Sequence, residues 1–181
     1  MGLIILDRDG VINQDSDNFI RSVEEFIPLP GSLEAIARLN QAGYIVTVAT
    51  NQSGIGRGLF DLNTLNAMHD KLRKLLAAIG GQVEMIVFCP HNPDDGCDCR
   101  KPKPGMYREI ARRVGVSLQD VPVIGDSLRD LQAAQAVAAR PILVRTGKGE
   151  RSLAKSADEL QGIPVYADLA AAVDALLSGD K

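Results

Sequence analysis

Two aspartates lie two positions apart at the end of an aliphatic run, where residues 3–10 read Leu-Ile-Ile-Leu-Asp-Arg-Asp-Gly. A short uncharged run of this kind predicts a buried parallel strand. Because burying an unpaired carboxylate is very costly, Asp7 and Asp9 indicate a metal ion rather than packing. In an open α/β sheet, ligands bind outside the carboxyl ends of the strands. We therefore expect the chemistry of this chain to start at this pair.

Three further polar segments each follow an expected strand: Thr50-Asn51-Gln52-Ser53, Arg100-Lys101-Pro102, and Gly125-Asp126-Ser127 with Asp130. A carboxylate can attack phosphorus and form an aspartyl phosphate, which divides one difficult displacement into two easier ones. Because the nucleophile and the phosphate are both anionic, the reaction needs a cation such as Mg²⁺, for which Asp7 and Asp126 offer carboxylates. The four segments together predict metal-assisted phosphoryl transfer.

The remaining residues of these segments would stabilise the transferred group and move protons. Lys101, with the hydroxyl of Thr50 and the amide of Asn51, would hold the phosphoryl oxygens as charge develops. Asp9 is placed to protonate the leaving oxygen and then to deprotonate the attacking water. Asp130 is expected to orient a ligand of the site.

All three cysteines of the chain fall in one short segment together with a histidine: Cys89, His91, Cys97 and Cys99. A Cys₃His set is a known stoichiometry for structural zinc. In a reducing compartment a metal is favoured over a disulfide. Four protein ligands leave no open position, so we expect a structural Zn²⁺ that fixes the loop leading to Lys101. The other histidine, His69, lies in a helical pattern and is interpreted as structural.

The elements that must position these residues alternate along the chain. Strands are expected at 3–7, 44–50, 85–89, 121–125 and 141–144, and helices at about 32–41, 62–79, 104–114, 127–138 and 169–177. Asp61 and Asp168 are candidate N-caps, and Pro104-Gly105 is a candidate helix start. The alternation predicts an α/β fold, a Rossmann-like parallel sheet with helices on both faces, in one domain over 1–181. No connection has room for a large cap domain, so the loops 11–27 and 90–103 would cover the site.

The charge and the hydropathy of the chain indicate which kinds of substrate and binding partner to expect. The 181 residues carry 20 basic and 23 acidic side chains, a net charge of −3, without a block of like charge. A nucleic-acid binder normally carries a basic stripe, so neither nucleic acid nor, in particular, a polynucleotide 3′-phosphate is favoured as substrate. No signal peptide and no apolar run of membrane-spanning length is evident. We expect a cytoplasmic monomer without a membrane partner, acting on a small anionic substrate.

The four segments resemble the motifs of the haloacid dehalogenase superfamily. The resemblance implies that superfamily's fold, with Asp7 as nucleophile, Asp9 as acid and base, and Mg²⁺ as cofactor. The zinc loop, the run Cys-Arg-Lys-Pro-Lys-Pro-Gly after it, and Thr-Asn-Gln-Ser-Gly-Ile-Gly-Arg-Gly over 50–58 are similar to the heptose 1,7-bisphosphate 7-phosphatases of this superfamily. This similarity covers about residues 3–147. It implies hydrolysis of the 7-phosphate, in the biosynthesis of nucleotide-activated heptose for the lipopolysaccharide core.

The resemblance also implies roles for individual residues. It places Mg²⁺ on Asp7, on Asp126 and on the backbone carbonyl of Asp9, and it gives Thr50 and Lys101 the transferred phosphoryl group. The implied contacts to the rest of the substrate are Arg8, Asp15, Ser16, Asp17, Asn18, Asn51, Gln52, Ser53 and Arg100. Arg57 is assigned to the second phosphate from its charge and position.

Other substrates remain open at this point. Histidinol-phosphate phosphatases share the Asp-Arg-Asp-Gly start and a similar zinc loop, and Asp15 and Asp17 could meet a cationic amine. Arg57 favours a second phosphate instead. A zinc-stabilised binding module without activity would lack at least one motif residue, and none is missing. Departures from the common motifs at Val11, at Ser127 and in the segment 16–18 leave the anomer and the exact sugar open.

Overall fold

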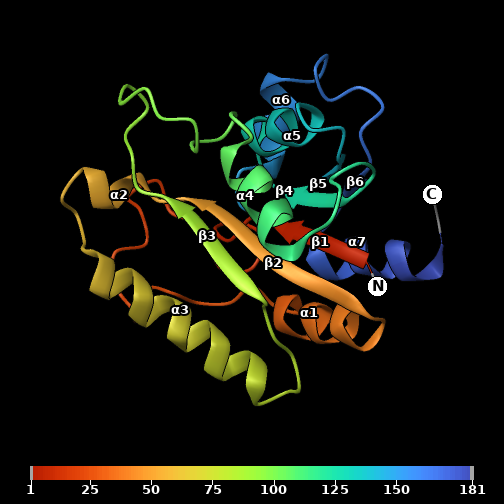
Figure 1. The fold of residues 1–181 in the computed structure, drawn as a ribbon, viewed down its shortest axis with the longest axis horizontal. Coiled ribbons are helices and arrows are strands. Elements are labelled where there is room, and N and C mark those ends of the chain that lie inside the picture. The colour runs from red at the N-terminus through yellow and green to blue at the C-terminus, as the bar shows by residue number, and fades with distance from the viewer. Residues whose placement is uncertain (1, 180–181) are drawn as a thin grey trace.

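Six parallel strands form one sheet in the order β3-β2-β1-β4-β5-β6 in the computed structural model, which describes residues 2–179 (Figure 1). The strands are β1 (Gly2–Leu6), β2 (Tyr44–Asn51), β3 (Met85–Cys89), β4 (Pro122–Gly125), β5 (Arg140–Val144) and β6 (Val165–Tyr166). Leu6 lies opposite both Val48 and Ile124 in the register. The residues that follow β1, β2 and β4 therefore emerge at the same edge of the sheet. The five predicted strands are confirmed, and the two-residue β6 is an addition.

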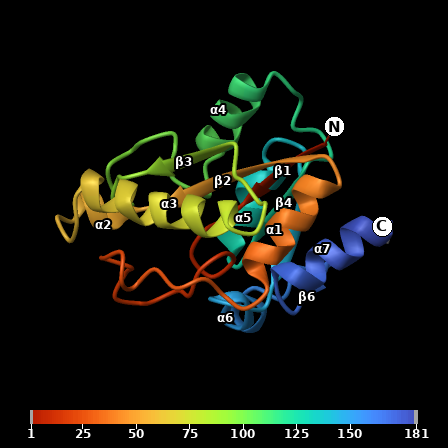
Figure 2. The same ribbon diagram turned by 90° about the horizontal axis from the view of Figure 1, so that it is seen from below.

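Helices cover both faces of this sheet, as the alternating pattern predicted. They are α1 (Ser32–Gln41), α2 (Ser53–Gly56), α3 (Leu62–Ala77), α4 (Gly105–Val114), α5 (Leu128–Gln135), α6 (Gly149–Lys155) and α7 (Leu169–Ser178). Helices α1, α3 and α7 lie on one face, and α4 and α5 lie on the other (Figures 1 and 2). The predicted helices at 62–79 and 127–138 end earlier, at Ala77 and Gln135. The short α2 and α6 were not predicted.

Strand β1 is buried on both sides, which explains its continuous apolar sequence. Ile4 and Leu6 pack in the core under α1, α3 and α7, whereas Leu3 and Ile5 pack in the core under α4 and α5. Each such side chain contributes about 1.5–3 kcal/mol by leaving water. A strand held this firmly gives the residue after it, Asp7, a fixed position.

The helix starts follow the predicted capping chemistry. The Oδ1 atoms of Asp61 and Asp168 accept hydrogen bonds of 2.8 Å from the backbone N–H groups of Thr64 and Ala171. At α5, Ser127 and Asp130 form a reciprocal capping box. Asp130, which caps this helix, is also one of the predicted site residues.

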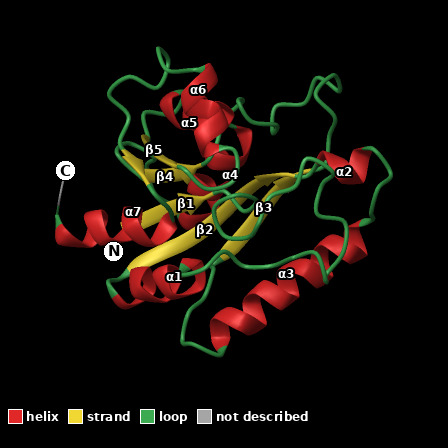
Figure 3. Ribbon diagram, turned by 180° about the vertical axis from the view of Figure 1, so that it is seen from behind, coloured by secondary structure: helices red, strands yellow, loops and turns green. Residues whose placement is uncertain are grey.

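The segments above the carboxyl edge of the sheet are loops rather than a cap domain (Figure 3). Between β1 and α1 the only pairing is in isolated bridges of Asn13 with Asp9 and Pro28, and the segment from β3 to α4 contains no strand or helix. The expected absence of a large cap therefore holds within residues 2–179. In the same residues, no helix is both long and apolar enough to span a bilayer.

Candidate active site

A polar cavity opens at the carboxyl edge of the sheet, where the loops after β1, β2, β3, β4 and β5 meet. Its lining consists of Asp7, Asp9, Asp15, Ser16, Asp17, Phe19, Ile20, Asn51, Gln52, Ser53, Arg57, Arg100, Lys101, Asp126, Ser127, Arg129, Asp130 and Lys148. Most of the residues that the sequence predicted for catalysis, Mg²⁺ binding or substrate binding are in this set. The exceptions are Arg8, Thr50 and Asn18. The parallel register therefore brings four distant motifs to one place.

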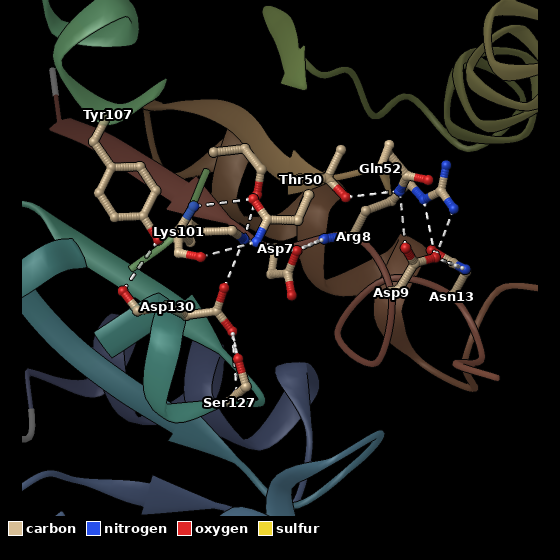
Figure 4. Close-up of polar contacts among 12 residues, drawn as sticks. Asp7, Arg8, Asp9, Asn13, Thr50, Gln52, Lys101, Tyr107, Ser127 and Asp130 are labelled. Atoms are coloured by element: carbon tan, nitrogen blue, oxygen red, sulfur yellow. Dashed lines mark hydrogen bonds and ion pairs between the residues drawn. The ribbon is translucent and has the colours of Figure 1, made fainter. Parts of the chain in front are cut away.

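Lys101 is the buried centre of the site (Figure 4). Its Nζ donates to Oδ1 of Asp7 at 3.0 Å, to Oδ1 of Asp130 at 2.6 Å and to the backbone oxygen of Ala49 at 2.8 Å. These three bonds use every proton of the ammonium group. The two carboxylates raise the pKa of Lys101 against the opposing effect of burial, so it stays charged. The cation is thus fixed beside the candidate nucleophile.

Asp130 orients Lys101 and is itself fully engaged. Its Oδ1 receives Lys101, and its Oδ2 receives the backbone N–H of Ser127 at 3.1 Å and the Ser127 hydroxyl at 2.9 Å. Burial alone would raise the pKa of Asp130, but Lys101 and Ser127 hold it below its usual value. The hydroxyl of Tyr107 donates to the Asp130 backbone oxygen at 3.2 Å. Asp130 therefore acts through its neighbours, and its oxygens are already occupied.

Asp7 and Asp126 fit the chemistry of a divalent-cation site. Oxygens of Asp7, Asp126 and Asp130 lie within 4.8 Å of one another. Burial and the negative charge of Asp130 raise the pKa of Asp7 to about 7 against the pull of Lys101. Burial and the charge of Asp7 likewise raise the pKa of Asp126 well above its usual value. A cation between them would favour the ionised form of both. Hard carboxylate oxygens are the ligands that Mg²⁺ prefers.

The backbone around Asp126 leaves no room for side chains. Gly10 and Gly147 have positive φ angles of 83° and 58°, and a Cβ added at either would overlap the Asp126 carboxylate. The N–H of Lys148 donates to Oδ2 of Asp126 at 2.8 Å. Lys148 was missed in the sequence, because a backbone donor carries no residue-type signal. The close backbone of Gly10 and Gly147 and the N–H of Lys148 therefore fix the position of Asp126, the second candidate Mg²⁺ ligand.

Asp9 is held by four donors from three side chains. Its Oδ1 accepts from Nε of Arg8 at 3.1 Å, Nη2 of Arg8 at 2.6 Å and Nδ2 of Asn13 at 2.8 Å. Its Oδ2 accepts one hydrogen bond from the residues that the structure describes, from Nε2 of Gln52 at 2.8 Å. Burial alone would raise the pKa of Asp9, but the Arg8 charge and these hydrogen bonds lower it. One oxygen is saturated, and the other keeps a lone pair for a proton.

Arg8 does not contact the cavity, which corrects its assignment as a substrate-binding residue. Its side chain is fully buried and is ion-paired with Asp9. The guanidinium lies over the ring of Phe26, with 5.4 Å between its carbon and the ring centroid. The sequence does not distinguish Arg8 from the other basic residues of the four segments. Arg100 and Lys101 line the cavity, whereas Arg8 points into the core.

Thr50 and Asn18 also lie outside the cavity wall. Thr50 is buried, and its hydroxyl accepts a hydrogen bond of 2.9 Å from Nε2 of Gln52. The next residue, Asn51, does line the cavity, and its side chain exchanges hydrogen bonds with the backbone of Lys101 at 3.0 and 3.2 Å. Asn18 is exposed beside the cavity, next to Phe19. Of these two neighbouring residues, Asn51 therefore faces the cavity and Thr50 does not.

Three arginines form a cationic rim on the cavity: Arg57, Arg100 and Arg129. Burial lowers the pKa of Arg100, and the neighbouring charges of Arg129 and Arg57 lower it further. Among residues 2–179, none of them forms an ion pair. Phe19, at a φ of 66°, places its ring under Arg57, 5.5 Å from the guanidinium carbon. The sequence analysis predicted Arg57 and Arg100 but missed two residues. Arg129 lies inside the fourth polar segment but was given no role, and Phe19 lies outside the four segments.

The predicted zinc ligands come together in the loop after β3. The Sγ of Cys89 lies 2.9 Å from that of Cys99 and 3.7 Å from that of Cys97, and Nδ1 of His91 lies 3.3 Å from Sγ of Cys99. All four ligand atoms lie within 4.8 Å of one another, and the cysteines form no disulfide. This set can hold a tetrahedral Zn²⁺. The loop is tied to the site, because the Cys89 backbone oxygen accepts from the Gln52 N–H at 2.7 Å.

Two protein-family models match the segments of the chain that form this site. The profile of the HAD-hydrolase-like family matches residues 98–172, and that of the polynucleotide kinase 3 phosphatase family matches residues 3–128. The two matches together cover all four motifs and the zinc loop.

Individual relatives are similar over nearly the whole chain. The D-glycero-beta-D-manno-heptose-1,7-bisphosphate 7-phosphatase of Pseudomonas aeruginosa is 59% identical over 175 residues, 97% of each chain. The protein of the same name from Bordetella bronchiseptica is 60% identical over 177 residues, 98% of each chain. A crystal structure of the D,D-heptose 1.7-bisphosphate phosphatase from B. bronchiseptica, complexed with magnesium and phosphate, aligns with a TM-score of 0.96 over 99% of both chains.

Proposed function

Because this chain belongs to the family of D-glycero-beta-D-manno-heptose-1,7-bisphosphate 7-phosphatases, we propose that it is the Mg²⁺-dependent enzyme that removes the 7-phosphate of this sugar bisphosphate. The observation that carries the proposal is a single cavity with two kinds of anion site. Asp7, Lys101 and Asp126 form a reaction site, and the arginine rim offers separate cations without ion-pair partners. A bisphosphate is the small substrate that needs both.

The site residues supply a two-step reaction. An oxygen of Asp7 attacks the phosphorus of the 7-phosphate, the bond from phosphorus to the C7 oxygen breaks, and that oxygen takes a proton from Asp9. Water then loses a proton to Asp9 and attacks phosphorus, which releases inorganic phosphate and free Asp7. Lys101 holds the Oδ1 of Asp7 throughout and stabilises the negative charge. Mg²⁺ on Asp7, Asp126 and the Asp9 backbone carbonyl would neutralise the charge of the phosphoryl group.

The lowered pKa of Asp9 is compatible with both of its roles. The free site holds Asp9 ionised through Arg8, which is the form that a base requires. Negative charge brought by a bound phosphate raises the pKa of a neighbouring carboxyl, so substrate binding favours the protonated form that the leaving oxygen needs.

Histidinol phosphate fits the cavity less well. Asp15 and Asp17 are the carboxylates that could bind the amine of histidinol phosphate. Both already have cationic partners, in α6 or just before it. Asp15 lies 3.5 Å from Nζ of Lys148, and Asp17 lies 3.2 Å from Nη1 of Arg151. An added amine would compete with these lysine and arginine partners and would also meet the arginine rim. The structure therefore favours the anionic second group of a sugar bisphosphate.

A phosphate-release panel tests the proposal. It compares both anomers of the heptose 1,7-bisphosphate, histidinol phosphate and a 3′-phosphorylated oligonucleotide, with the Asp7→Asn protein as the control for contaminating phosphatase. We expect the β-anomer to have the highest kcat/KM, and phosphorus NMR to show a product that keeps the 1-phosphate. Activity should stop with a chelator and return with Mg²⁺. A preference for histidinol phosphate or for the oligonucleotide would reject the assignment.

We further propose that the enzyme acts in the cytoplasm as a monomer.

A further inference from the structure

A buried polar cluster lies behind the acid–base residue, on the side away from the cavity. Arg8 is its centre and spans the distance between Asp9 and helix α3. On one side its Nε and Nη2 hold Oδ1 of Asp9. On the other side its Nη1 lies 3.3 Å from Nε2 of His69 and 3.8 Å from the sulfur of Met68. The reaction described above uses neither α3 residue.

The chemistry of arginine determines the state of His69. A guanidinium has donors only, so the contact between Nη1 of Arg8 and Nε2 of His69 requires that nitrogen to be an acceptor. His69 must then be neutral, with its proton on Nδ1. Burial and the neighbouring Arg8 charge lower the pKa of His69 to about 3, which keeps the ring neutral at physiological pH. A buried imidazole in this state is a fixed acceptor for Arg8.

The acceptor matters because the two oxygens of Asp9 are treated differently. Arg8 and Asn13 place three donors on Oδ1, whereas Oδ2 has one donor, Nε2 of Gln52, and both Asp9 and Gln52 line the cavity. A guanidinium that turned about its long axis would release Oδ1 and let the carboxyl rotate. His69 and the ring of Phe26 constrain that turn, from the edge and the face of the guanidinium.

We propose that His69 is a positioning residue for acid–base transfer, whose Nε2 fixes Arg8 so that Oδ1 of Asp9 stays saturated and Oδ2 exchanges the proton with the substrate. This inference rests on the proposed function only through the acid–base role of Asp9. It extends the site to helix α3, whose residues do not line the cavity.

The test uses the proton demand of the leaving group. A sugar alkoxide needs a proton from Asp9 as it leaves, whereas the nitrophenolate of p-nitrophenyl phosphate leaves without one. His69→Leu removes the acceptor, and His69→Gln keeps one in its amide oxygen. Leu72→Ala is the control for a general loss of stability, because Leu72 is a buried residue of the same helix, α3. The measured quantity is kcat/KM for each substrate, because it reports the first chemical step.

We expect H69L to lower kcat/KM for the heptose bisphosphate about 10-fold, a fraction of the about 100- to 10,000-fold that general acid catalysis contributes, with less than a threefold loss for p-nitrophenyl phosphate. H69Q should recover most of the loss, and L72A should leave the ratio of the two substrates unchanged. An equal loss on both substrates in H69L, no loss at all, or an H69Q as impaired as H69L would overturn the proposal.

Two further measurements keep the outcome decisive. If the heptose bisphosphate is not a substrate, the proposed function fails by itself, and the same ratio is measured with the alkyl phosphate that the enzyme does hydrolyse. If H69L does not fold, nitrogen NMR of the wild-type enzyme decides. Between pH 5 and 8 it should show His69 neutral, with a protonated Nδ1 and a bare Nε2. The opposite tautomer, or an imidazolium at pH 5, would refute the assignment.

Discussion

The Nζ of Lys101 lies 3.0 Å from Oδ1 of Asp7, although 94 positions separate the two residues in the chain. Both side chains are largely buried, and Lys101 also pairs with Asp130. Among residues 2–179 no donor is bonded to Oδ2 of Asp7, so this oxygen is available for the proposed attack on phosphorus. This pair thus links the loop that carries the proposed zinc ligands to the proposed nucleophile, which directly follows β1.

Replacing the nucleophile should abolish turnover without unfolding the protein. Asp7→Asn keeps the size of the side chain and an oxygen for Lys101, but a carboxamide does not form an acyl phosphate. We expect kcat to fall about 1,000-fold or more, as for other nucleophile replacements. Phosphate release measures the activity, and a thermal melt measures the fold. Appreciable residual activity in a well-folded variant would reject Asp7 as nucleophile.

Removing Lys101 should cost stability as well as activity. Lys101→Met leaves two buried carboxylates without their cation, which costs about 3–5 kcal/mol of unfolding free energy. It should also lower kcat about 100-fold or more through the loss of charge stabilisation. Urea titration of K101M, D130N and the double variant tests the pairing. The double variant should lose less stability than the sum of the single variants, and simple additivity would contradict the ion pair with Asp130.

Breaking the cysteine cluster should release a metal. The wild-type protein should contain about one Zn²⁺ per chain, and Cys97→Ser should lower that content and the melting temperature, because metal binding contributes to folding. Asp94→Asn, an exposed residue of the same loop, is the control. Elemental analysis measures the zinc content. Zinc content unchanged by C97S would show that the four side chains do not form a closed site.

The arginine rim should act on the second phosphate only. Arg57→Gln removes a cation that lies over Phe19 and has no ion-pair partner in the described part of the chain. Losing one charge-assisted hydrogen bond of about 1.5–3 kcal/mol predicts a KM for the bisphosphate at least 10-fold higher. The KM for p-nitrophenyl phosphate, which has no second phosphate, should stay the same. Arg38→Gln, at a pair with Asp174 on the surface, is the matched control. Equal effects on both substrates would remove Arg57 from this role.

His69 should make the protein less stable in acid. Its pKa is about 3 in the folded protein, against 6.5 for an ordinary histidine. As the pH falls from 6.5 toward 3, the unfolded chain therefore binds a proton that the folded protein does not, and stability decreases. At pH 5 this amounts to about 2 kcal/mol relative to neutral pH. Urea titrations should show wild type losing that much stability relative to H69Q, and parallel pH profiles would contradict it.

Local patterns predicted most of the fold. The apolar runs gave the five longer strands, because a strand covered on both faces has to be continuously hydrophobic. Asp61 and Asp168 gave two helix starts, because their side chains satisfy N–H groups that every helix leaves free. Three elements were not predicted. Helices α2 and α6 have four and seven residues, too few to show a helical periodicity, and the two residues of β6 are too few to form an apolar run.

The residue types in the chain determined by themselves which chemistry is present. Paired aspartates, a lysine and a Cys₃His set have few uses besides metal and phosphate chemistry, and their order along the chain follows the order of the strands. Only the tertiary structure decided which of these side chains face the cavity. Arg8 points into the core, and the carboxylate of Asp130 accepts hydrogen bonds from Lys101 and Ser127. His69 lies where its Nε2 can accept a hydrogen bond from Arg8. These outcomes depend on neighbours that are distant in sequence, because hydrogen-bond partners and burial are set by packing.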